Sequence, residues 1–354
     1  MKKQLSTLFI LISIISFSCM QNKESANHNV RQVVDTIGFA QYDWQMDSIM
    51  NRLTIPIDQN KTWRLAITPH DDYAYVGNLY PQVLNGFKAK TVILFSVAHK
   101  ARNYNLENQI IFDSFDAWSA PYGNVKVSGL RDEIISKLTD SLRIVHNEMH
   151  SVEHSVEALI PFLQFNNREL EIIPVLVPYM SFDKMQQITE SFTDVLSEIM
   201  IAKNLKWGSD IAILISTDAV HYGDEDWGGK NYAHYGTDSI GTMKARNHEI
   251  EIINNCLVED ITKDKIQKFI NYTVKESDYK EYKWTWCGRY SVPFGLLTAL
   301  KLNEKMNGLE IKGEFIGYSN SIDHKILKVD DLRMGTTAPA NNHHWVGYAA
   351  VAYE

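Results

Sequence analysis

The sequence is short of cysteine and proline and lacks any dense cluster of lysine and arginine, and these shortages exclude whole classes of protein. Of its 3 cysteines, only Cys256 and Cys287 lie beyond residue 19, which excludes a fold held together by a disulfide network. The formal net charge of -8 and the missing basic stripe argue against nucleic acid as a partner. With 354 residues, 45% of them apolar, the chain has an ordinary globular composition and is long enough for one large domain or two small ones.

Residues 1–19 differ in character from the rest. Lys2 and Lys3 precede the apolar run LSTLFILISIISF, which is typical of a secretory signal and too short for a stable transmembrane anchor. Small residues before Cys19 resemble a bacterial lipoprotein cleavage site, although Ser16 stands where an aliphatic residue is usual; a simple cleaved signal peptide is the alternative. We therefore expect lipidation at Cys19 and an extracytoplasmic protein anchored to a bacterial membrane, on its periplasmic face or at the cell surface.

The rest of the chain predicts a tether followed by one domain. Residues 20–36 are polar and indicate a flexible tether, which makes the membrane an anchor point only. Residues 37–354 contain no internal repeat and no break in composition. Strand-like and helix-like segments alternate along them, which predicts a single α/β domain with parallel neighbouring strands.

Three strand-like apolar runs are each followed by titratable side chains. The runs lie within residues 62–68, 91–97 and 211–216. The carboxyl ends of parallel strands meet at one edge of a sheet, where ligands bind in open α/β folds. We therefore expect the residues that follow these runs to converge on one site: His70, His99, Asp218 and His221.

Histidine in this arrangement favours a metal site. Neutral imidazole binds divalent transition metals, and carboxylate or thiolate ligands complete such sites. Asp218 and His221 are three residues apart, so a tight turn or a first helical turn places both on one side, as ligands or as an acid/base pair. Cys287 precedes a helical pattern that contains Pro293, and a helix start favours the thiolate. Cys256 lies on the apolar face of a predicted helix.

The segment His150-Ser-Val-Glu153-His154 matches the inverted zinc-peptidase signature. Histidines at i and i+4 of a helix can bind zinc while Glu153 activates water, as in a zinc hydrolase. The alternative is a helix whose polar end faces the site, because the segment continues directly into VEALIPFLQF.

Six motifs occur in the order seen in the Memo family, which is also known in prokaryotes as AmmeMemoRadiSam system protein B. The resemblance spans residues 62–352 and rests on Pro69–Gly77 (PHDDYAYVG), a strand ending in His99, EHSVE followed by PFLQ from Glu153, Ser216–Gly223 (STDAVHYG), Cys287–Arg289 and Val346–Ala350 (VGYAA). The family resembles the class III extradiol dioxygenases, which are non-haem iron enzymes. This resemblance implies a three-layer α/β/α fold with a central mixed, largely parallel sheet.

The resemblance also implies roles for particular residues. His70 and His99 match the two histidine ligands, and Cys287 stands where the dioxygenases place a carboxylate ligand. His221 matches their acid/base histidine, with Asp218 beside it as a second catalytic or ligating group. The residues expected to contact substrate are His154, Arg289 and Tyr73.

One transition-metal ion is the expected cofactor, with iron or copper favoured and zinc as a further candidate. A thiolate is softer than a carboxylate and suits zinc, copper or a differently tuned iron. We expect a metal-dependent, dioxygenase-like oxidoreductase acting on a small molecule. The alternative is a non-catalytic metal- or ligand-binding protein with a vestigial pocket. The sequence also departs from the family pattern at Asp71 and Asp72, and in the loop around His99.

Overall fold

The computed structural model describes residues 29–53, 60–308, 310–323 and 326–354. The predicted signal peptide and lipidation site Cys19 lie outside these residues. None of the helices in the described ranges is long and apolar enough to cross a membrane.

A mixed sheet forms the middle layer of the domain. Its central strands β6, β8, β3, β9 and β2 run parallel, and β15 joins β2 in antiparallel pairing, followed by β14 and β11. The bounds in spatial order are β1 Val30–Arg31, β5 Ala117–Trp118, β6 Val125–Val127, β8 Glu171–Val177, β3 Thr91–Val97, β9 Ile211–Ser216, β2 Leu65–Thr68, β15 His344–Tyr353, β14 Lys312–Asn320 and β11 Glu259–Asp260. Shorter strands are β4 Ile110–Phe112, β7 Arg143–Val145 and β10 His221–Gly223, and a separate hairpin pairs β12 Val274–Lys275 with β13 Asp278–Tyr282.

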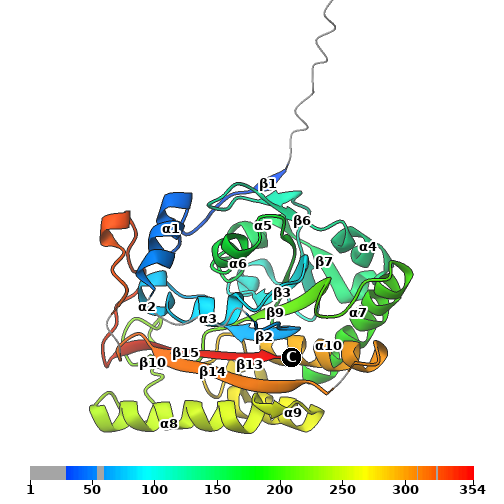
Figure 1. The fold of residues 1–354 in the computed structure, drawn as a ribbon. Coiled ribbons are helices and arrows are strands. Elements are labelled where there is room, and N and C mark those ends of the chain that lie inside the picture. The colour runs from blue at the N-terminus through cyan, green and yellow to red at the C-terminus, as the bar shows by residue number, and fades with distance from the viewer. Residues whose placement is uncertain (1–28, 54–59, 309, 324–325) are drawn as a thin grey trace, which may run out of the picture.

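Helices cover both faces of this sheet. One face carries α1 Asp43–Arg52, α2 Tyr73–Val76, α3 Tyr80–Leu84, α5 Asn147–Ser151 and α6 Ile160–Asn166. The other carries α4 Leu130–Lys137, α7 Phe182–Ala202, α8 Ser239–Cys256, α9 Lys263–Thr273 and α10 Ser291–Lys305. Figure 1 shows α8 and α9 below β14 and β15, on the side opposite α1 and α6. The 3-10 turns are η1 Ala101–Tyr104, η2 Asp140–Leu142 and η3 Asp330–Leu332. The predicted three-layer α/β/α class is therefore confirmed.

The apolar runs of the central strands explain the layers. Side chains alternate between the two faces of a strand, so a strand covered on both faces must be apolar throughout. In β3, Ile93 and Phe95 belong to the core under α7 and α10, whereas Val92 and Leu94 belong to the core under α3 and α6. A uniform apolar run is thus what a central strand of a three-layer domain requires.

The N-terminal boundary differs from the prediction. Residues 29–36 belong to the folded domain, although they were predicted as the end of the tether: Val30–Arg31 pair in parallel with β5. Arg31 is 1% exposed, forms an ion pair with Glu157, and donates to the carbonyl of His150 at 3.2 Å. The physical reason is that a polar segment can be buried when each charge has a partner, and these partners lie far away in sequence.

Candidate metal centre

The predicted convergence at the carboxyl edge of the sheet is confirmed. Strand β9 lies between β3 and β2, so the loops that follow these strands are neighbours. The rings of His70 and His99 lie 5.2 Å apart, centroid to centroid. Nε2 of His70 and Nε2 of His221 lie 3.4 Å and 4.0 Å from Oδ2 of Asp218. Four residues from three strand ends therefore meet.

His70 is shared by two groups of potential metal ligands. In one group the ligand atoms of His70, His99 and His154 all lie within 4.8 Å of one another. The other group consists of His70, Asp218 and Cys287, with the same spacing. These distances suit donors around a single ion, so the arrangement provides a candidate metal-binding site.

Ser216, at the end of β9, determines which nitrogen of His70 faces the cluster. Its hydroxyl donates to the carbonyl of Ser155 at 2.7 Å, so its oxygen accepts the hydrogen of His70 Nδ1, also at 2.7 Å. The lone pair of His70 is therefore on Nε2, which lies 3.5 Å from Sγ of Cys287. Histidine ligands of metals are commonly oriented by a hydrogen bond to the other ring nitrogen.

Glu153 orients His99 in the same way. One carboxylate oxygen lies 2.8 Å from His99 Nδ1, and the other accepts the backbone N–H of His99 at 2.8 Å. Glu153 is completely buried. Burial opposes ionisation of this carboxyl, but the adjacent His99 outweighs it and lowers the pKa of Glu153. The carboxylate therefore accepts from Nδ1–H and leaves Nε2 of His99 for a ligand.

Cys287 is held against the loop that follows β9. The backbone N–H of Asp218 donates to Sγ at 3.1 Å. Gly288 allows this close approach, because a Cβ at this position would lie 2.2 Å from Oγ1 of Thr217. Burial raises the pKa of Cys287. That the following helix favours the thiolate stays a prediction, and desolvation at this buried position acts against it.

Asp218 is buried, whereas the side chain of His221 is 25% exposed, and both titrate abnormally. Burial raises the pKa of Asp218 to about 7 and lowers the pKa of His221 to about 3. Nε2 of His221 has no hydrogen-bond partner within the described part of the chain. The two side chains face each other from a tight loop between β9 and β10, which is one of the two local structures that their spacing predicts.

The three residues predicted to contact substrate occupy different surroundings. The ring of His154 stacks on His99 at 4.9 Å, which places it within ligand distance of the cluster. Arg289 lines a cavity beside Cys287. Tyr73 is fully buried against Phe162, and its hydroxyl donates to the Ala158 carbonyl at 2.6 Å. The structure therefore gives Tyr73 no exposed surface for the predicted substrate contact.

The zinc-peptidase alternative is contradicted by the local backbone. Helix α5 ends at Ser151, so His150 and His154 do not share a helical face. His150 lies against the Trp118 ring and its Nε2 is 3.1 Å from the Ile111 carbonyl. It is absent from the candidate ligand groups found among the described residues. Glu153, the presumed base of a hydrolase, instead holds His99.

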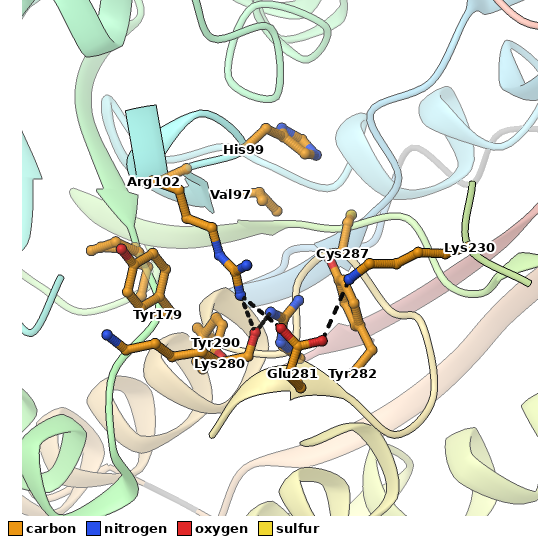
Figure 2. Close-up of a pocket in the computed structure, with 14 residues that line it drawn as sticks. Val97, His99, Arg102, Tyr179, Lys230, Lys280, Glu281, Tyr282, Cys287 and Tyr290 are labelled. Carbon is orange, nitrogen blue, oxygen red and sulfur yellow. Dashed lines mark hydrogen bonds and ion pairs between the residues drawn. The ribbon is translucent and has the colours of Figure 1, made fainter. Parts of the chain in front are cut away.

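Cavities of opposite charge border the cluster. One, of about 180 Å³, reaches His99 and Cys287 and carries Arg102, Lys280 and Arg289 in its walls (Figure 2). Another, of about 430 Å³, reaches His70 and His154 and is lined by the carboxylates Asp35, Asp71 and Asp72. Asp71 and Asp72, noted as departures from the family pattern, therefore make one approach to the cluster acidic.

Sequence reasoning missed the groups that surround the ligands. Ser216 is part of the STDAVHYG motif, and that position was the available signal for its role. The cavity residues Arg102 and Lys230 lie in loops with no motif. Lys280 and Glu281 belong to β13, whose sequence DYKEY lacks the apolar alternation of a strand.

The fold and the ligand geometry define an α/β protein with a candidate transition-metal centre at the carboxyl edge of its sheet. The chain belongs to the Memo family, because the family model described as Memo-like protein matches residues 40–331. A MEMO1 family protein of Aquifex aeolicus is 26% identical over 260 residues, covering 73% of this chain and 78% of that protein.

Other similar proteins have the same family name. The match to a MEMO1 family protein of Pyrococcus abyssi is 22% identical and covers 73% of this chain and 80% of that protein. A MEMO1 family protein of Methanosarcina barkeri is 28% identical over 159 residues, which are 44% of this chain and 54% of that protein. A solved structure of an uncharacterized protein from Escherichia coli K12 aligns with a TM-score of 0.41 and 11% identity, over 80% of this chain and 98% of that one.

Proposed function

We propose that this protein is a metal-dependent oxidoreductase of the Memo family, with one iron or copper ion bound by His70, His99 and Cys287. The observation that carries the proposal is the position of Nε2 of His70, 3.5 Å from Sγ of Cys287 and within ligand distance of His99. Hydrogen bonds to Nδ1 leave Nε2 of both histidines available for metal.

The donor set is chemically suited to such an ion. Imidazole suits iron, copper and zinc, and a thiolate shifts the preference toward softer ions. A bound redox metal would supply electron transfer to or from a substrate. Its binding displaces protons from Cys287 and from His99, whose pKa is raised by Glu153 and Cys287 despite burial. Asp218 lies close enough to serve as an additional ligand.

The residues beside the cluster supply proton transfer. His221 is neutral because burial lowers its pKa, and its Nε2, which has no partner among the described residues, is available for a hydrogen bond with a substrate hydroxyl or thiol. Oδ2 of Asp218 lies 4.0 Å from that atom. Because burial raises the pKa of Asp218 to about 7, this carboxyl can hold or release a proton near neutral pH.

A second candidate function is metal binding without turnover, in a pocket that is vestigial. The burial of the central ligands favours it, since His70 is 0% and Cys287 4% exposed. Stoichiometric metal, together with no turnover of catechols, thiols or reduced metal ions, would identify this function.

We further propose that the protein acts outside the cytoplasm, anchored by a lipid on Cys19. Support comes from the sequence alone: a basic start, an apolar run and small residues before the cysteine. The polar residues that follow Cys19 separate the domain from the bilayer surface.

Metal analysis tests the ligand assignment. The protein is purified without chelators or a histidine tag, and its metal content is measured by mass spectrometry beside the Cys287→Ser and Cys256→Ser variants. Cys256 is the matched control because it is also buried but lies on α8, outside the candidate ligand groups. We expect about one equivalent of iron or copper, retained in Cys256→Ser and largely lost in Cys287→Ser. Equal metal content in both variants would remove Cys287 from the ligand set.

A further inference from the structure

Arg289 is a buried cation without a carboxylate partner. Its side chain is 6% exposed, and among the described residues no carboxylate forms an ion pair with it. Its Nη2 donates to the Lys280 carbonyl at 3.1 Å, and its guanidinium also hydrogen-bonds the Tyr282 and Tyr290 side chains, whereas Nε has no partner among the described residues. Buried charges in proteins are normally paired, because desolvation of an unpaired ion is costly.

Other cations around Arg289 leave the cavity with an excess of positive charge. Arg102 and Lys230 share one carboxylate, Glu281, at 3.3 Å and 3.4 Å. Lys280 pairs with Glu107 at 2.5 Å. Figure 2 shows Glu281 between Arg102 and Lys230. Arg289 is therefore the wall cation that has no carboxylate partner in the described chain.

The cavity also has an apolar part and an open path to the metal ligands. Val97, Val177 and Pro178 line it, and His99 and Cys287 lie at one end. The guanidinium of Arg289 stacks over Tyr282 at 3.5 Å and Tyr290 at 4.6 Å, which holds its plane in one orientation. A cavity of about 180 Å³ accommodates a molecule of roughly one aromatic ring.

We propose that this cavity binds a small carboxylate-bearing molecule, whose carboxylate pairs with Arg289 and whose other end faces His99 and Cys287. A carboxylate matches the planar, pre-oriented guanidinium and its partnerless Nε. A planar carboxylate fits better than a tetrahedral phosphate, because it can lie in the plane that Tyr282 and Tyr290 fix for the guanidinium. That this ligand is also the substrate rests on the proposed metal-dependent function, whereas its binding does not.

Calorimetric titration with benzoate tests the proposal, beside benzamide as its neutral analogue and phenyl phosphate as a dianion. We expect benzoate to bind and benzamide to bind much more weakly. Arg289→Gln should weaken benzoate binding about tenfold or more, since a hydrogen bond to a charged group is lost. Arg168→Gln is the matched control: this guanidinium also stacks on a tyrosine, Tyr122, at 3.3 Å but lies outside the cavity. It should bind benzoate as the parent protein does.

A variant that binds benzoate more tightly is needed, because weaker binding in Arg289→Gln could also result from misfolding. Glu281→Gln removes the carboxylate that competes for the cavity cations, and we expect it to tighten benzoate binding by about threefold. Benzoate binding unaffected by Arg289→Gln, or unaltered or weakened in Glu281→Gln, would overturn the proposal. So would equal binding of benzamide, and tighter binding of phenyl phosphate would overturn the assignment to a carboxylate.

The benzoate-binding cavity and the metal ligands can be tested independently of each other. Titration of His70→Ala, which should lack metal, measures benzoate binding without the metal centre. Arg289-dependent binding in a protein that never contains metal would support the cavity and refute the metal centre. Stoichiometric metal without benzoate binding would support the metal centre and refute the binding cavity.

Discussion

Nδ1 of His99 lies 2.8 Å from Oε1 of the fully buried Glu153, which fixes the ring so that Nε2 lies on the side of the candidate ligand cluster. The same carboxylate oxygen also accepts the backbone N–H groups of His154 and Ser155, at 3.0 Å each. Glu153 therefore positions two histidines of the candidate centre at once. The segment that resembles a peptidase signature is, in this fold, the support of a histidine ligand.

Replacing Glu153 by Gln should weaken metal binding without abolishing it. The amide can no longer act as a full acceptor for both the ring and the backbone of His99, and loss of such a supporting bond commonly lowers metal affinity about 10- to 100-fold. Competition with a chromophoric chelator measures the affinity. Glu148→Gln, an exposed glutamate on α5, is the matched control and should bind metal as the parent does. An unchanged affinity in Glu153→Gln would show that His99 is not a ligand.

Ser216→Ala should act on His70 by a similar route. Without the serine oxygen, Nδ1 of His70 loses its acceptor, and the ring is free to place its hydrogen on Nε2, which competes with metal. We expect metal affinity to fall about tenfold. Ser96→Ala is the control, since Ser96 is also a buried serine of a central strand but its hydroxyl has no partner in the described chain. If both variants lost the same metal affinity, the cause would be altered packing of the strands and not the hydrogen bond to His70.

The central strands could be predicted almost to the residue, and the reason is physical. Strands β3, β8 and β9 are covered on both faces, so their apolar runs begin and end where burial does. The convergence of His70, His99 and Asp218 follows from their positions directly after such strands. Local sequence therefore contains enough information for both the sheet and the ligand positions.

Elements that depend on distant partners could not be predicted. Residues 29–36 look like a tether because their polar composition is local, whereas the partner that buries Arg31 is Glu157. Hairpin strand β13 is half-exposed and pairs only with the short β12, so no periodic pattern marks it. Strand β13 contributes Lys280, Glu281 and Tyr282 to the cationic cavity, so this part of the site could not be predicted either.

Removing the side chain of Arg31 should destabilise the domain strongly. Arg31→Ala leaves the buried carboxylate of Glu157 without its cation, and breaking a buried pair from one side costs about 3–5 kcal/mol. Thermal unfolding followed by circular dichroism measures the loss. Arg333→Ala, on an exposed turn, is the control and should melt like the parent. If both variants melted alike, residues 29–36 would act as the tether that their composition suggests.

Cys19→Ala should release the protein from the membrane. A lipid on this cysteine supplies the anchor in our proposal, and the helices of the described chain provide no alternative span. Membrane fractionation and metabolic labelling with a radioactive fatty acid measure anchoring and lipidation. We expect label and membrane association in the parent and neither in the variant. Unlabelled protein that is secreted would instead indicate a simple cleaved signal peptide.

Glu249, which lies outside the ligand cluster, should make the free energy of unfolding depend on pH. Its carboxyl is buried on α8 and accepts from Trp286 Nε1 at 2.8 Å and from the backbone N–H of Val220 at 3.0 Å. Burial raises the pKa of Glu249 from 4.5 to about 7. The folded state therefore binds this proton more tightly than the unfolded state does.

The free energy of unfolding should consequently contain a contribution that is fully present below pH 4.5 and is lost as pH rises to about 7. Its size is on the order of 2 kcal/mol. Glu249→Gln cannot ionise, so its stability relative to the parent should increase between pH 5 and pH 8, as measured by urea unfolding midpoints. Glu251→Gln, an exposed position on the same helix, should shift the midpoints little at either pH. A constant difference between parent and Glu249→Gln at both pH values would mean that Glu249 does not titrate in this range.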